Sequence, residues 1–316
     1  MSGIDSEQKK GTRVLKRDFL KLSDFSRSEL DSLLRRAIQL KAEREQGLTH
    51  STLKGRILGL VFEKASTRTK LSFEAAMLGL GGTVITLQAS DSQIARGEPV
   101  KDTARVASRY VDALMYRTFG DDRLEEFARY SRVPVINGLS EGGHPVQILA
   151  DLMTVIQRKG TLEGKRIAWV GDAASNMALS WIEASQLFGF DLVIAAPEGF
   201  RPPRALLDGS PRVSLTGSPQ EAVSQADVVN TDVWTSMGQE AESAARLKAF
   251  QGYCLDLALL NRAKPDAMVL HCLPAHRGEE ITDEVIEDPR SAIFDEAENR
   301  MHVQKALLEA LLNPQA

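Results

Sequence analysis

Apolar positions along the first half of the chain alternate between short runs typical of buried strands and longer runs with helical spacing. Strands are predicted at residues 56–62, 83–87, 113–116 and 133–136, and helices at residues 70–80, 100–110 and 123–130. A short strand followed by a longer helix is the unit from which parallel sheets are built. The first half therefore predicts a parallel sheet flanked by helices.

The same alternation begins again after Gly160. Strands are predicted at residues 166–170, 192–196, 227–230 and 268–270, a helix at residues 177–188, and a surface loop at residues 197–211. A helix over residues 144–159, with Pro145 in its first turn, is expected to link the two halves. An amphipathic helix at residues 296–312 is expected to pack back on the first half. We predict an α/β fold of two domains, each with a central parallel sheet flanked by helices, joined by interdomain helices.

Composition supports this organisation and narrows the choice of partners. The 316 residues are about twice the length of an average domain, and 43 % hydrophobic residues are enough for two substantial cores. A formal charge of -4 argues against binding of nucleic acid or an anionic membrane surface. The polar N-terminus and the absence of a long apolar run argue against secretion or membrane insertion. Two cysteines in apolar surroundings, Cys254 and Cys272, fit a reducing cytoplasm.

The clearest chemical motif is the segment FEKASTRTK at residues 62–70, between a predicted strand and a predicted helix. Free N–H groups at a helix start, hydroxyl groups and the Arg68 guanidinium form a compact site for phosphate. The alternative is an ordinary helix N-cap beside a solvated arginine. Because the chain has no P-loop sequence, a small phosphate compound fits the motif better than a nucleoside triphosphate.

A second motif, HPVQ at residues 144–147, places an imidazole and a carboxamide on the first turn of a helix. These groups suit a carbonyl and its attached amine, although a histidine in this position also commonly caps or packs against the helix. No metal ion is expected, because the histidines and cysteines lack the spacing of a zinc site. No cofactor is expected either.

Two further motifs directly follow predicted strands: DVWTSMG at residues 232–238 and HCLP at residues 271–274. Ligands of open α/β sheets bind at the carboxyl ends of strands, and the glycine in the first motif suits a closing loop. An ordinary turn and a small buried thiol are the alternatives. The segment GDAASN at residues 171–176 lacks the G-x-G-x-x-G pattern, which argues against a nucleotide-binding oxidoreductase.

Together these motifs resemble the transcarbamoylase family over nearly the whole chain. FEKASTRT, followed by SFE at residues 72–74, and HPVQ are similar to the carbamoyl-phosphate half that all transcarbamoylases share. The second half resembles the branch that acts on ornithine, since the aspartate branch has leucine where this chain has Cys272. One departure is Ser175, where the family usually has asparagine; Asn176, in the ligand-binding position, is kept.

The resemblance implies a role for individual residues, none of which follows from composition or spacing alone. It implies that carbamoyl phosphate is bound by Ser66, Thr67, Arg68, Thr69, Gln93, Arg117, His144, Gln147, Cys272, Leu273 and Arg300. It implies that ornithine is bound by Asn176, Asp232, Ser236 and Met237. The catalytic residues would be Arg68, Arg117, His144, Asp232, Cys272 and Arg300.

The resemblance also implies a reaction and an assembly. Residues 1–147 plus 300–316 would bind carbamoyl phosphate, and residues 148–299 would bind ornithine. The carbamoyl group would pass to the δ-amine of L-ornithine, giving L-citrulline and phosphate, with an anabolic role in arginine biosynthesis and a catabolic role in arginine breakdown as the alternative. A homotrimer or an assembly of trimers is implied, with Gln93 serving its own site or a neighbour's. Another transcarbamoylase activity, on aspartate, putrescine or N-acetylornithine, and an inactive homologue remain alternatives.

Overall fold

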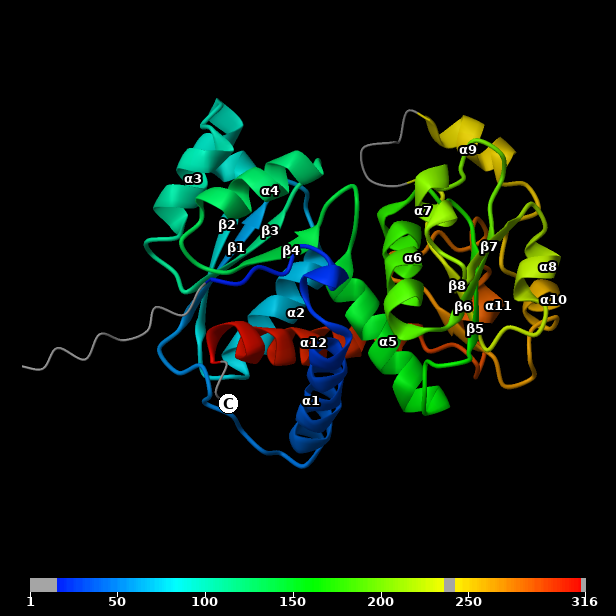
Figure 1. Cartoon of the computed structure of the whole chain (residues 1–316), viewed down its shortest axis with the longest axis horizontal. Coiled ribbons are helices and arrows are strands. Elements are labelled where there is room, and N and C mark those ends of the chain that lie inside the picture. Colours follow the sequence, from blue (N-terminus) through cyan, green and yellow to red (C-terminus); the bar gives the residue numbers. More distant parts are fainter. Residues whose placement is uncertain (1–15, 236–241, 314–316) are drawn as a thin grey trace, which may run out of the picture.

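The computed structural model describes residues 16–235 and 242–313, whose strands form the two parallel sheets that lie side by side in Figure 1. The first sheet has the strand order β2-β1-β3-β4 and contains β1 (Ile57–Phe62), β2 (Thr83–Gln88), β3 (Ala113–Arg117) and β4 (Val135–Leu139). The second has the order β7-β6-β5-β8-β9 and contains β5 (Arg166–Val170), β6 (Asp191–Ala195), β7 (Val213–Thr216), β8 (Val228–Thr231) and β9 (Met268–Leu270). This architecture confirms the predicted fold class.

The first sheet is covered by helices on both faces because its strands are apolar on both sides. In β3, Ala113 and Met115 join the core shared with α1 (Arg27–Glu45) and α2 (Thr67–Leu78), whereas Leu114 and Tyr116 face the opposite side. The opposite face is covered by α3 (Val100–Ala107) and α4 (Asp121–Tyr130). Short 3-10 turns complete this half: η1 (Leu22–Asp24), η2 (Ala89–Asp91) and η3 (Gln93–Arg96).

The second sheet is built in the same way. In β5, Ile167 and Trp169 pack with α6 (Asn176–Phe188), whereas Ala168 and Val170 belong to a separate core on the other face. The remaining helices of this half are α7 (Arg204–Asp208), α8 (Pro219–Val223), α9 (Ser243–Ala249), α10 (Leu257–Leu260) and α11 (Asp283–Ile286). The prediction of a loop over residues 197–211 is corrected by α7, and β7 was not predicted.

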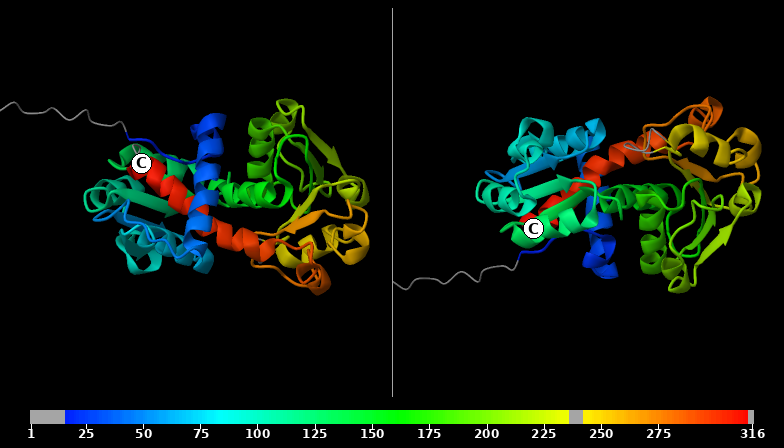
Figure 2. Two further views of the ribbon diagram at one scale, coloured as in Figure 1. Left: turned by 90° about the horizontal axis from the view of Figure 1, so that it is seen from below. Right: turned by 90° about the horizontal axis from the view of Figure 1, so that it is seen from above.

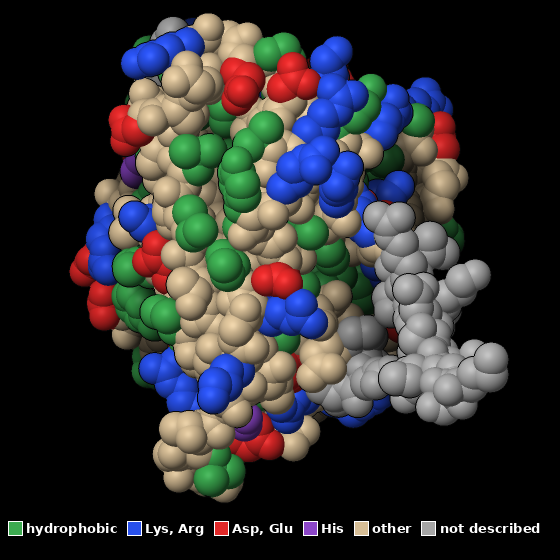
Figure 3. Space-filling view, turned by 90° about the vertical axis from the view of Figure 1, so that its left-hand side faces the viewer, with side chains coloured by type: hydrophobic (Ala, Val, Ile, Leu, Met, Phe, Trp, Pro, Cys, Tyr) green, Lys and Arg blue, Asp and Glu red, His purple; other side chains and the backbone are tan. Residues whose placement is uncertain are grey.

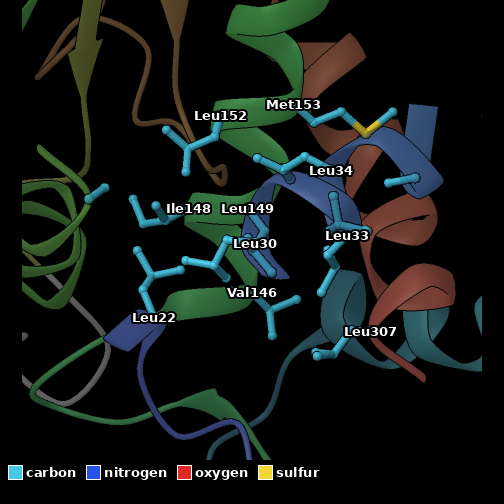
Figure 4. Close-up of a cluster of buried hydrophobic side chains, with 14 of the residues drawn as sticks. Leu22, Leu30, Leu33, Leu34, Val146, Ile148, Leu149, Leu152, Met153 and Leu307 are labelled. Carbon is cyan, nitrogen blue, oxygen red and sulfur yellow. The ribbon is translucent and has the colours of Figure 1, made fainter. Parts of the chain in front are cut away.

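Two long helices join the halves. Helix α5 (Pro145–Lys159) runs from the first sheet to the second, and α12 (Ile293–Leu312) returns beside it, as both views of Figure 2 show. In Figure 4, Leu30 and Leu33 of α1 point into a cluster with Leu149 of α5 and Leu307 of α12. The expected return of the C-terminal helix to the first half is confirmed, although the helix begins three residues earlier than predicted.

The two strand orders also fix where a ligand can bind. In each sheet the order reverses beside its first strand, between β1 and β3 and between β5 and β8, and the loops that follow these strands diverge at that point. Ligands of open α/β sheets occupy such crevices. No helix within residues 16–235 and 242–313 has the length and apolar composition needed to cross a bilayer.

Candidate active site

A cavity of about 650 Å³ lies between the carboxyl ends of the two sheets. Both halves of the chain contribute to its wall. The predicted site residues that line it are Ser66, Thr67, Arg68, Thr69, Arg117, His144, Asn176, Asp232, Cys272, Leu273 and Arg300. Residues that come from motifs 234 positions apart in the sequence therefore meet around one space.

The start of α2 forms one wall of the cavity. Ser66 is the N-cap, and its hydroxyl accepts a hydrogen bond from the Thr69 N–H at 3.3 Å. The helix begins at Thr67, three residues before the predicted start, because this cap satisfies one of its free N–H groups. The cap and the anion-site interpretations are thus compatible: Ser66 caps the helix and also lines the cavity, beside a half-buried Arg68. The positive end of the helix dipole adds to the charge of that arginine.

Two buried arginines converge on the Thr69 hydroxyl. Arg300 Nη2 donates to Thr69 Oγ1 at 2.9 Å, and Arg117 Nη1 lies 3.5 Å from the same oxygen. Burial, followed by the charge of Arg300, lowers the pKa of Arg117 to about 10. Burial also lowers the pKa of Arg300. Because a pKa of about 10 leaves Arg117 charged at neutral pH, its guanidinium suits an anion in the cavity.

His144 lies at the N-cap of α5, and its backbone N–H donates to Ser180 Oγ at 2.8 Å. Burial, and then the charges of Arg300 and Arg117, hold the pKa of His144 well below its ordinary value. The ring is therefore neutral at physiological pH. A neutral imidazole beside two guanidinium groups is suited to donate a hydrogen bond to an uncharged oxygen such as a carbonyl.

On the opposite wall, Asn176 is the first residue of α6, and the Ser175 hydroxyl accepts from the Ala178 N–H at 3.3 Å. Ser175, the departure from the family pattern, is therefore a working N-cap. With this cap, α6 begins at Asn176, whose side chain lines the cavity.

Asp232 and Cys272 meet across the ends of β8 and β9. The Cys272 thiol donates to Asp232 Oδ1 at 3.2 Å, and the Val233 N–H donates to the same oxygen at 2.8 Å. Burial raises the pKa of Asp232, and burial followed by the charge of Asp232 raises the pKa of Cys272 well above its ordinary value. Cys272 is therefore a neutral thiol that holds the carboxyl group in place.

Leu273 adopts φ of 58°, in the left-handed region that non-glycine residues seldom occupy. Its N–H donates to His271 Nδ1 at 2.9 Å, and His271 Nε2 lies 3.0 Å from Glu280 Oε1. These bonds hold the Leu273 backbone against the cavity in spite of its strain.

Two predicted site residues, Gln147 and Gln93, are not among the described residues that line this cavity. Gln147 is fully buried behind Arg300, which contacts its carboxamide oxygen. Gln93 is exposed on η3. Ser236 and Met237 lie outside the described residues. The roles of these four residues stay predictions, as do the roles of the predicted residues that line the cavity.

The cavity also contains residues that the sequence analysis did not select: Lys64, Ala65, Leu139, Met177, Val233, Thr235, Ser243, Pro274, His276 and Glu279. Lys64, Ala65, Val233, Thr235 and Pro274 lie inside the quoted motifs, and Met177 directly follows the segment 171–176, so taking every residue of each motif and its next neighbour would have found them. Ser243, His276 and Glu279 carry no such signal.

Within the described part of the chain, donor atoms of Asp232, His271 and Cys272 lie close enough together to hold a metal ion, as do those of His276, Glu279 and Glu280. In the first group the Cys272 thiol is hydrogen-bonded to the Asp232 carboxyl group, and His271 is hydrogen-bonded to Glu280. The prediction that no metal is needed is not tested by this geometry.

Two family models cover most of the chain. Residues 17–157 match the aspartate/ornithine carbamoyltransferase carbamoyl-P binding domain, and residues 163–311 match the Asp/Orn binding domain of the same family. Each model contains one of the two sheets described above.

Individual relatives agree with the family models. The chain is 55 % identical to an ornithine carbamoyltransferase of Geobacter sulfurreducens, over 94 % of this chain and 99 % of that protein. It is 52 % identical to an anabolic ornithine carbamoyltransferase of Pseudomonas aeruginosa, over 94 % and 97 %. Among solved structures, ornithine carbamoyltransferase from Pyrococcus furiosus matches with a TM-score of 0.90 and 46 % identity, over 95 % of this chain and 98 % of that one.

Proposed function

The chain belongs to the aspartate/ornithine carbamoyltransferase family, and we propose that the cavity between its two sheets is the active site for carbamoyl transfer from carbamoyl phosphate to L-ornithine. The δ-amine nitrogen attacks the carbamoyl carbon, the C–N bond forms, and the bond from that carbon to the phosphate oxygen breaks. The products are L-citrulline and phosphate, and the amine releases one proton to solvent.

The cationic wall binds the phosphate group. Arg68 and Arg117 neutralise its charge, and the free N–H groups at the start of α2 satisfy its oxygens. Charge that develops on the departing phosphate is stabilised by the same groups, which makes phosphate a better leaving group.

The carbamoyl oxygen is bound by donors between the two walls. As the amine attacks, negative charge grows on this oxygen, and His144, Arg300 and the Thr69 hydroxyl lie where they can donate to it. The low pKa of His144 supports this role, since the neutral ring keeps its donor without adding repulsion to the neighbouring arginines.

The second wall positions ornithine. Asp232 is suited to bind an amino group of ornithine, and Asn176 is suited to its polar backbone. A second carboxylate, as in aspartate, would face the Asp232 carboxyl group, which supports ornithine over aspartate. Enclosure of the cavity favours the neutral, reactive amine over the ammonium form.

The proposal rests on one observation. Arg68, Arg117 and Arg300 line one wall of the cavity, which suits an anionic carbamoyl donor. Asp232 and Cys272 line the opposite wall, which suits an amine acceptor. The test measures citrulline formed from carbamoyl phosphate with ornithine, aspartate, putrescine and N-acetylornithine in parallel. Ornithine should give the highest kcat/KM. Higher activity with any of the other three amines would reassign the substrate, and no product with all four would indicate an inactive homologue.

We further propose an anabolic role, consistent with the 52 % identity to an anabolic relative. The site itself serves either direction of arginine metabolism. Two measurements distinguish the roles. Hyperbolic saturation by carbamoyl phosphate, with a KM in the micromolar to millimolar range, suits synthesis. Net phosphorolysis of citrulline in cells would indicate breakdown.

A homotrimer, or an assembly of trimers, is our proposal for the oligomer. The edge strand β2 and the adjoining α2 expose Ile85, Leu71 and Leu78, the last two by 61 % and 62 %. Figure 3, seen from the β2 side, shows hydrophobic side chains on this face between charged ones. Gln93 follows β2, so a neighbouring subunit on this face would receive it. Light scattering should give three times the mass of the chain or a multiple of that; a monomer would contradict the proposal.

Two smaller proposals complete this assignment. The division into residues 1–147 plus 300–316 and residues 148–299 is supported by the packing of α12 against α1 and α2 of the first half. A cytoplasmic location is supported by Cys254 and Cys272, which are both free thiols.

A further inference from the structure

Gln147 has a carboxamide whose orientation is set by two buried acids. Its Nε2 donates one hydrogen to Asp151 Oδ1 at 2.8 Å and the other to Glu296 Oε1 at 2.7 Å. Both N–H groups of the amide are thereby used. The amide oxygen is left to face Arg300, whose Nη1 donates to it.

This orientation matters because an amide can rotate by half a turn with little change in shape. The rotated amide would place its NH₂ group against the Arg300 guanidinium, where neither group can accept a hydrogen bond. The two acids remove that alternative. Arg300 in turn donates to Thr69 Oγ1 at 2.9 Å on the cavity wall, so its position depends on the amide behind it.

Glu296 has a second contact that Asp151 lacks. Its Oε2 accepts from the backbone N–H of His271 at 2.9 Å, directly before Cys272. The other oxygen of Asp151 is buried and accepts no N–H from the residues that the structure describes, and the two acids hydrogen-bond each other when one of them holds a proton. Glu296 and Arg300 are also four residues apart on α12, and so share one face of that helix.

The raised pKa values of the two acids fit a structural role for both side chains. Burial, followed by the charge of Asp151, raises the pKa of Glu296 well above its ordinary value, and burial raises the pKa of Asp151 to about 7. The pair therefore carries fewer than two negative charges at neutral pH. It does not cancel the positive charge that the cationic wall offers to a phosphate.

We propose that Glu296 is a positioning residue that links the two walls of the active site: it fixes Arg300 through Gln147 and fixes the segment carrying Cys272 through the His271 N–H. The inference rests on the proposed function, because it takes the roles of Arg300 and Cys272 from that reaction. Neither Glu296 nor Asp151 touches the cavity, so both act only through their neighbours.

Two isosteric variants test the proposal. Glu296→Gln replaces one oxygen by an NH₂ group whose nitrogen, unlike the oxygen of a carboxyl group in either protonation state, cannot accept from the Gln147 N–H or the His271 N–H. Asp151→Asn keeps an oxygen toward Gln147, and its NH₂ group can supply the hydrogen that the two acids otherwise share. We expect Glu296→Gln to lower kcat/KM for carbamoyl phosphate about 10²-fold, as for loss of one transition-state donor. Asp151→Asn should lose less than tenfold.

The measurements are kcat and KM for each substrate, the Kd of inorganic phosphate by calorimetry, and the thermal midpoint. Asp295→Asn, which removes a half-exposed acid on the same helix that pairs only with Arg158 among the described residues, is the control and should match the wild type. The proposal fails if kcat, KM and phosphate affinity of Glu296→Gln stay within twofold of the wild type, whether or not the thermal midpoint falls. It also fails if Asp151→Asn is as damaging as Glu296→Gln, since charge would then matter rather than amide orientation.

The same measurements separate this proposal from the reaction assignment. If the wild type forms no citrulline from ornithine, the proposed function is wrong. The effect of Glu296→Gln on phosphate affinity would still show whether Glu296 positions Arg300.

Discussion

The two walls of the cavity are built by different means. The cationic wall, to which we assign carbamoyl phosphate, begins in one continuous segment, residues 66–69, where a capped helix start and Arg68 form a positive site locally. The opposite wall, to which we assign ornithine and which we call the ornithine wall, is assembled from the ends of β5, β8 and β9, which bring Asn176, Asp232 and Cys272 together. The first wall starts from a short local sequence, to which β3 and α12 add Arg117 and Arg300, whereas the second has no local segment of this kind and exists only after the whole sheet has formed.

The two walls also differ in how burial affects the charge of their side chains. On the first wall the charged state is retained: the pKa of Arg117, although lowered, is about 10. On the second wall burial shifts Asp232 and Cys272 toward their neutral forms. A permanently cationic wall suits a phosphate, while a wall that resists charge suits an amine that must lose its proton before it reacts. The following predictions test this contrast.

The largest effect is expected from Arg68→Ala, which removes charge from the locally built wall. We expect kcat/KM for carbamoyl phosphate to fall about 10²- to 10³-fold, the usual loss for one group that stabilises a transition-state charge. Arg129→Ala, an exposed arginine on α4, is the matched control and should be unchanged. Activity near the wild-type level at limiting carbamoyl phosphate would show that residues 66–69 are an ordinary helix cap.

The pH profile tests the wall that must accept a neutral amine. An alkylamine with a pKa near 10.4 gains about tenfold in neutral fraction for each pH unit, so kcat/KM for ornithine should rise up to about 10²-fold from pH 6 to 8. His144, with a pKa well below its ordinary value, and Cys272, with a pKa well above its own, do not titrate in this window.

Asp151 does titrate there, since its pKa is about 7, and Asp151→Asn separates its contribution from that of the amine. The rise should persist in that variant. A flat profile in both proteins would contradict the need for a neutral amine.

A smaller effect, confined to one substrate, is expected from Asp232→Asn. The NH₂ group of asparagine cannot accept a hydrogen bond from the amine, and this loss of a buried acceptor should raise the KM for ornithine about 10- to 100-fold. The Kd of inorganic phosphate should stay at the wild-type value, because the cationic wall is untouched. Asp208→Asn on α7 is the control. Weakening of both ligands by Asp232→Asn would mean that the two walls are not separable at this residue.

The contrast between the walls also explains what the sequence could predict. Both sheets, the linking helix and every motif at a strand end could be predicted from the sequence, because periodicity and the signals of caps and turns are local. The helix over residues 204–208 and the strand β7 were missed because they are short and follow a proline-rich stretch. Their form depends on packing against the sheet rather than on their own pattern.

The contacts of Gln147 could not be predicted in the same way. Its partner Glu296 is 149 residues away along the chain, and no local pattern connects the two. The motif HPVQ placed Gln147 on the first turn of α5, which the structure confirms, but which face of that turn meets the cavity depends on α12. Gln93 is a similar case, since its surroundings in a trimer would depend on another subunit.

The smallest effect is expected from removal of metal ions, which tests the ornithine wall against a different chemistry. Possible metal-ligand atoms lie within 4.8 Å of one another on Asp232, His271 and Cys272. However, the Cys272 thiol already donates a hydrogen bond to the Asp232 carboxyl group. A metal there would require the thiolate, and burial opposes its formation. We therefore expect kcat and both KM values to be unchanged after dialysis against EDTA, with an untreated sample in parallel. Loss of activity that returns when a divalent ion is added would show that these three residues hold a metal and that Cys272 is a ligand rather than a hydrogen-bond donor.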